Sequence, residues 1–117
     1  MTARPIEISV HNALVLATAP LLMVIPYVLT FSPGIGYLTF FLGAILMGVA
    51  LAGSAPKRAL SLSAQSGFDW AIGIAIFSIG ILAGITGQET FTTIFLVGFG
   101  AAHLALTAST RYSARGA

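Results

Sequence analysis

The sequence predicts an all-α membrane protein in which four helices cross the bilayer as two consecutive helical hairpins. Residues 8–56 carry no charged side chain, and one spanning helix needs only about 20 mostly apolar residues. Two further uncharged stretches follow, at residues 70–88 and 90–110. Only 7% of the 117 residues are charged and 57% are hydrophobic, whereas soluble domains have about 25% charged residues. A water-soluble domain of this size could not bury so much apolar surface.

The first hairpin is expected to contain spans at residues 8–30 and 36–53. Pro33 and Gly34 lie between them, and these residue types break helices and favour turns. Arg4 precedes the first span, as in a signal peptide, but no small-x-small cleavage pattern follows it. We therefore expect the first helix to be retained.

Two prolines, Pro20 and Pro26, lie inside the first span. Each removes a backbone hydrogen bond and can bend the helix, which neighbouring helices in a membrane can accommodate. We expect kinks that shape helix packing, and a hinge or a substrate contact is the alternative.

The second hairpin is expected to contain spans at residues 67–86 and 91–110. A longer connection at residues 54–66 precedes it and includes Pro56, and the short turn between its helices includes Glu89. The whole chain, residues 1–117, is predicted to form a single membrane domain because its length permits only one.

Basic residues predict the orientation. In short loops they accumulate on the cytoplasmic side. Four spans place every basic residue on one side of the membrane, whereas three or five spans would divide them. We therefore expect a cell (inner) membrane protein with both termini in the cytoplasm. The basic residues are Arg4, Lys57, Arg58, Arg111 and Arg115.

The two hairpins share weak internal similarity. An offset of 55 residues aligns Gly43 with Gly98 and Ala50 with Ala105, among a few other identities. The first helices of the two hairpins share none at that offset. These matches leave open whether the hairpins arose by duplication.

A short motif late in the first span resembles the SPW-repeat family of small membrane proteins. Units of that family are helix hairpins with Ser-Pro-Trp late in the first helix. Here the corresponding residues are Ile25, Pro26 and Tyr27, so the proline is kept and the other two differ. The second unit, at Ser78, has neither the proline nor the aromatic residue. The resemblance implies a bacterial integral membrane protein without an assigned reaction, and it supplies no catalytic residues.

Glycines repeat at helical spacing on the predicted spans. In the third span, residues spaced three or four positions apart share one face, and they include Gly73, Gly80 and Gly84. Such small-residue faces let helix backbones approach closely in lipid. We expect them to pack the bundle internally, and a homo-oligomer or docking on a larger membrane complex is the alternative. The predicted packing glycines are Gly43, Gly73, Gly80, Gly84, Gly98 and Gly100.

Three ionisable residues are the candidate functional polar groups, because charges within a membrane are costly and often functional. His103 lies roughly 10 Å inside the last span, given 1.5 Å per residue, and shares a face with Gly100. His11 begins the first span on the same side of the membrane. Asp69 is expected near the start of the third span, as a helix-start carboxylate or turned inward. These three side chains could converge as structural hydrogen-bonding groups or as a proton relay.

The sequence shows no pattern typical of catalysis. It lacks cysteine, His-x-x-His spacing and a Gly-rich phosphate loop, so we expect no enzyme, cofactor or metal site. The few dispersed basic residues exclude a nucleic-acid footprint. We expect a structural or accessory protein whose partner is the lipid bilayer. A small transporter or channel using His103 and Asp69 is the main alternative, and a cofactor-bearing subunit is a third.

Overall fold

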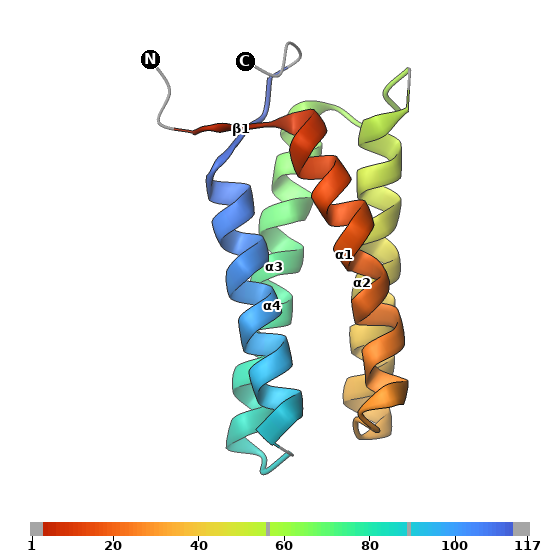
Figure 1. The fold of residues 1–117 in the computed structure, drawn as a ribbon, viewed down its shortest axis with the longest axis vertical. Coiled ribbons are helices and arrows are strands. Elements are labelled where there is room, and N and C mark those ends of the chain that lie inside the picture. The colour runs from red at the N-terminus through yellow and green to blue at the C-terminus, as the bar shows by residue number, and fades with distance from the viewer. Residues whose placement is uncertain (1–3, 56, 89, 114–117) are drawn as a thin grey trace.

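The protein is a bundle of four antiparallel helices (Figure 1). The computed structural model describes residues 4–55, 57–88 and 90–113. All four helices are long and apolar enough to cross a membrane, which confirms the predicted fold class. Pro56, Glu89 and Arg115 lie outside the described residues. The helices are α1 (Ile8–Val28), α2 (Pro33–Ser54), α3 (Leu62–Ile85) and α4 (Thr90–Ala108).

A short parallel pairing joins the two ends of the chain. Strand β1 (Ile6–Glu7) pairs with β2 (Thr110–Arg111), with Ile6 opposite Thr110 and Glu7 opposite Arg111. The pairing lies at the end of the bundle where α1 begins and α4 ends (Figure 1). The sequence did not predict it, since residues 109 and 110 were assigned to the last span.

Helix α3 begins at Leu62, about one turn earlier than predicted. Ser61 caps it, because its side-chain oxygen accepts a hydrogen bond from the backbone N–H of Ala64. Asp69 therefore lies about two turns inside the helix and is only 1% exposed. The expectation of a helix-start carboxylate is wrong, and the inward-facing alternative holds.

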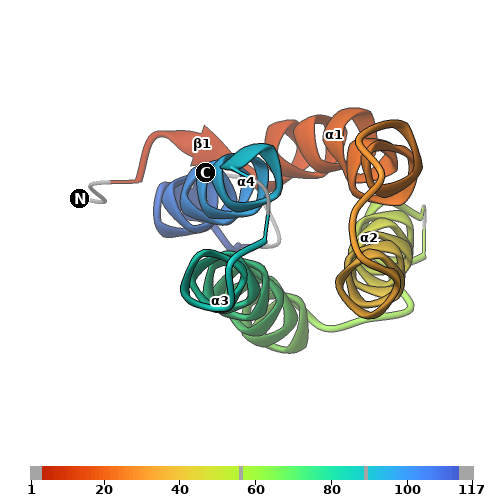
Figure 2. The ribbon, with the colours of Figure 1, turned by 90° about the horizontal axis from the view of Figure 1, so that it is seen from below.

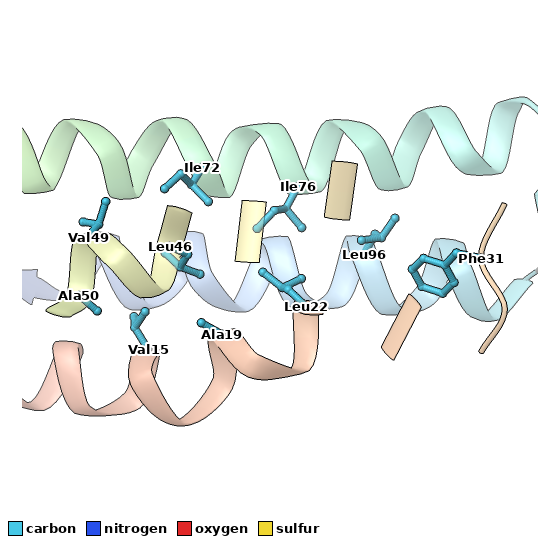
Figure 3. Close-up of a cluster of buried hydrophobic side chains, with 10 residues drawn as sticks. All are labelled: Val15, Ala19, Leu22, Phe31, Leu46, Val49, Ala50, Ile72, Ile76 and Leu96. Atoms are coloured by element: carbon cyan, nitrogen blue, oxygen red, sulfur yellow. The ribbon is translucent and has the colours of Figure 1, made fainter. Parts of the chain in front are cut away.

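The helices pack in sequential pairs. Helix α1 packs along α2 and α3 packs along α4, while α2 also contacts α3 (Figure 2). A continuous hydrophobic core fills the space between the helices, and its side chains point inward from all four (Figure 3). The core residues are Val15, Ala19, Leu22, Phe31, Leu46, Val49, Ala50, Ile72, Ile76 and Leu96.

Glycines allow the closest helix approaches. A Cβ atom added at Gly100 would lie 2.7 Å from the backbone nitrogen of Phe77, and one at Gly80 would lie 2.8 Å from that of Val97. Gly43 and Gly73 are equally confined by side chains of α1 and α4, respectively. These four positions therefore act as predicted.

The other two predicted packing glycines differ. Gly84 is exposed, and its nearest neighbour is the Thr93 methyl group, 3.3 Å from an added Cβ. Gly98 faces away from the bundle and has nothing within 4 Å, so its prediction as an internal packing residue is wrong. The proposed repeat offset aligns buried Gly43 with exposed Gly98 and buried Ala50 with exposed Ala105. That offset therefore does not superpose the buried faces of α2 and α4.

The contrast between Gly100 and Gly98 gives a paired prediction. Gly100→Ala forces the backbones of α3 and α4 apart, which is expected to lower the free energy of unfolding by about 1–3 kcal/mol. Gly98→Ala, on the same helix, adds a methyl group into open space and should not destabilise the protein. Denaturant titration of both variants in the same detergent measures the difference, and equal destabilisation would contradict the packing described here.

Candidate functional site at the polar end of the bundle

Buried polar side chains gather at the end of the bundle where α1 begins and α4 ends. His11 is 0% exposed, Asp69 is 1% exposed and His103 is 5% exposed. They come from α1, α3 and α4, respectively, so the site forms only when these helices pack. The predicted convergence of His11, Asp69 and His103 is confirmed as geometry.

The Asp69 carboxylate is the centre of this cluster. Its Oδ2 atom lies 3.0 Å from Nε2 of His11, although the contact lacks the alignment of a hydrogen bond. The other nitrogen of the same ring, Nδ1, lies 2.8 Å from the hydroxyl oxygen of Thr110. The imidazole of His11 therefore bridges α3 and the strand β2.

His103 reaches the same residue through the backbone. Its Nε2 donates a hydrogen bond to the main-chain carbonyl of Asp69 at 3.1 Å, and it lies 3.9 Å from Oδ1 of the carboxylate. Gly73 makes this approach possible, because a Cβ there would lie 3.0 Å from Cδ2 of His103. The two imidazole centroids are 6.1 Å apart.

Tyr112 closes the site beyond the end of α4. Its hydroxyl donates a 2.7 Å hydrogen bond to Oδ2 of Asp69, and its ring packs edge-on against His11. Burial raises the pKa of the Tyr112 phenol, and the hydrogen bond to the Asp69 carboxylate raises it further. The phenol thus stays protonated and serves as a donor to the carboxylate.

A second polar network lies beside the first. The Arg58 guanidinium donates to the carbonyl of Gly53 at 2.7 Å, to that of Leu60 at 3.2 Å and to Oε1 of Gln65 at 2.6 Å. Gln65 in turn donates to Oδ1 of Asn12 at 2.6 Å. Because Asn12 follows His11, α1 contributes adjacent side chains to the two networks.

Sequence reasoning missed part of this site. Gln65 precedes Asp69 by one helical turn, and that spacing was a readable sign that both occupy one face. Nothing in the sequence places Tyr112 over α3. Arg58 was interpreted only as a basic loop residue, whereas its guanidinium holds the α2–α3 connection.

The arrangement can hold and exchange protons, because a carboxyl, two imidazoles and a phenol contact one another. Within the described part of the chain, no group of three or more His, Cys, Asp or Glu side chains is placed to hold a metal ion. His103 also lines an open groove of about 280 Å³ between α1 and α4, together with Leu14, Thr18 and Phe99.

A scan against protein-family models and searches of curated proteins and of solved structures find no match to this chain. The resemblance to SPW-repeat proteins therefore stays a prediction.

Tyr112 predicts a pH dependence of stability. Because its pKa is raised on folding, the unfolded chain loses this proton first as the pH rises. The stabilisation is complete below the ordinary tyrosine pKa of about 10 and falls above it. The free energy of unfolding of the wild type should decline more steeply above that pH than that of Tyr112→Phe. Tyr27→Phe, at an exposed position, is the control and should follow the wild type. If the free energy of unfolding falls equally with pH in the wild type and in Tyr112→Phe, the stabilising role assigned to Tyr112 is contradicted.

Arg58 and its neighbour Lys57 offer a second matched pair, since replacing either by Gln removes the same charge. Arg58→Gln loses the donors to Gly53, Leu60 and Gln65, and hydrogen bonds to charged groups contribute about 1.5–3 kcal/mol each. We expect Arg58→Gln to lower the free energy of unfolding by about 1–3 kcal/mol and Lys57→Gln, at an exposed position, to change it little. Denaturant titration decides, and an equal response would assign the effect to net charge alone.

Proposed function

We propose that this protein is a structural or accessory component of the membrane, which acts by packing against copies of itself or within a larger membrane complex. The observation that supports this proposal is the layer of packed apolar side chains beneath the polar cluster. Ala19, Leu22, Leu46 and Ile76 are 0% exposed, and Leu96 is 1% exposed. These side chains lie in the middle of the bundle (Figure 3). They separate the polar cluster from the opposite end.

The outer surface supports association within the bilayer. All four helices expose large apolar side chains, including Phe41, Ile74 and Ile94. On α4 the exposed residues Gly98, Ala101 and Ala105 follow helical spacing, and small residues on a spanning helix permit close approach of another helix. The connections between helices are short, which leaves little of the chain for binding soluble partners.

The proposed location is the cell (inner) membrane with both termini in the cytoplasm. Arg4, Arg58 and Arg111 support it, because they lie at the same end of the bundle as the β1–β2 pairing. Such a one-sided distribution is what the positive-inside rule requires.

A small transporter or channel is the second candidate, and the contact of Asp69 with two imidazoles favours it. Transport would need a polar route through the other half of the bundle. Thr39 and Thr92 are buried there, and the Thr39 hydroxyl donates to the carbonyl of Ile35. Proton-coupled flux in vesicles that disappears in His103→Ala would favour this candidate over the accessory role.

Native mass spectrometry of the protein from its own membranes, in mild detergent, tests the accessory role. We expect an assembly of fixed stoichiometry. Gly98→Leu should weaken it by about tenfold, equivalent to ~1.4 kcal/mol, by blocking close approach to α4. Gly48→Leu is the matched control, because Gly48 is also exposed with open space around it, but on α2.

If the wild type is a monomer, as both variants would then also be, the proposal is contradicted. Equal weakening by both substitutions would contradict the assignment of the contact to α4.

A further inference from the structure

The hydrogen-bond directions around His11 determine which ring nitrogen carries a proton. The Thr110 hydroxyl has a single hydrogen, and its oxygen lies 2.6 Å from the carbonyl oxygen of Leu106. Two oxygens that close need a hydrogen between them, and a carbonyl can only accept. Thr110 therefore donates to Leu106. Its oxygen must accept from Nδ1 of His11 at 2.8 Å, so that Nδ1 is protonated.

The opposite nitrogen then faces a carboxylate. With a proton on Nδ1, a neutral imidazole presents a lone pair at Nε2, and Nε2 lies 3.0 Å from Oδ2 of Asp69. Nε2 of His11 is buried and has no aligned hydrogen-bond partner. Two acceptors in contact repel each other, and neither can turn to water here because the side chains are 0% and 1% exposed.

One additional proton removes this conflict. Placed on Nε2 it makes an imidazolium beside a carboxylate, and placed on Asp69 it makes a carboxylic acid beside a neutral ring. Either state turns the contact into an attraction. His103 does not supply this proton, because the proton on its Nε2 is already donated to the main-chain carbonyl of Asp69.

We infer that His11 and Asp69 form a buried proton-binding site that holds one exchangeable proton in addition to the one on Nδ1 of His11. The inference does not depend on the proposed accessory function.

The surroundings of the pair determine how the proton enters. Half-buried Tyr112, which donates to Oδ2 of Asp69, lies between the pair and the aqueous phase at the β1–β2 end of the bundle. In the other direction Val15, Ile72 and Ile76 close the site with apolar side chains. The proton therefore exchanges with the aqueous phase on one side of the membrane.

The other titratable and charged groups around the pair lie on α4, on β1 and β2, and on the residues that flank these strands. His103 of α4 lies on the Oδ1 side of Asp69, and Tyr112 lies over His11. Arg4 donates to the carbonyl of Thr110, and Glu7 lies opposite Arg111 in the backbone register of β1 and β2. Arg4 and Arg111 thus lie at the β1–β2 pairing, the side from which the proton arrives.

Nuclear magnetic resonance can test the inference without mutation. Asp69 is the only aspartate and His11 and His103 are the only histidines, so carboxyl-¹³C aspartate and ring-¹⁵N histidine labels report on this site alone. The full-length protein in lipid nanodiscs at neutral pH is the sample, and His103→Gln assigns the two ring patterns. We expect Nδ1 of His11 to be protonated, together with either a protonated Nε2 or a protonated Asp69 carboxyl.

A neutral His11 protonated only on Nε2, or a His11 protonated only on Nδ1 beside an ionised Asp69, would overturn the inference. The first outcome would mean that Thr110 donates to the ring, and the second would mean that the additional proton is absent.

Thr110→Val provides a second readout, since it keeps the side-chain shape but removes the acceptor for Nδ1–H. We expect His11 to change to the neutral Nε2–H form and the additional proton to be lost. Thr86→Val is the control, because the Thr86 hydroxyl also donates to a carbonyl four residues earlier but lies at the opposite end. An unchanged His11 pattern in Thr110→Val would contradict the role assigned to Thr110.

Discussion

Burial of the Asp69 carboxylate governs the architecture of one end of this bundle. A carboxyl group 1% exposed within a membrane helix is stable only if neighbouring groups replace the water that it has lost. Here these groups come from α1, from α4 and from the segment after α4, as His11, His103 and Tyr112. Removing one partner of a buried charge typically costs several kcal/mol. The cluster also links α3 to α1 and to the segment after α4, with which α3 otherwise shares few contacts.

Close helix packing makes that compensation possible. Gly73 leaves room for the His103 ring, and Gly100 and Gly80 bring the backbones of α3 and α4 together. Without these glycines the imidazole of His103 would lie too far from the Asp69 carbonyl. The short β1–β2 pairing then holds Thr110 and Tyr112 over the site. Small residues and polar residues thus act together. The glycines set the distance between the helix backbones, and that distance allows the polar side chains to form hydrogen bonds.

The division of the bundle into a polar end and an apolar middle bears on function. A polar cluster sealed on one side by Leu22, Leu46 and Ile76 can exchange protons with one aqueous phase only. A conducting path would need polar groups through both halves. This asymmetry is consistent with a packed membrane component whose buried cluster fastens the helices together. It also places the candidate proton site where the aqueous pH of a single compartment reaches it.

The sequence by itself determined the helix number and the hairpin order, and it placed His11, Asp69 and His103 at the same end of the bundle. Hydrophobic length and helical periodicity are local properties, so the convergence of His11, Asp69 and His103 was predictable. Only the tertiary structure decided which partners they meet. The roles of Tyr112 and Thr110 depend on how the chain leaves α4, and that of Arg58 depends on the path of a loop. The exposure of Gly98 depends on which side of α4 meets α3, and no local pattern encodes such long-range contacts.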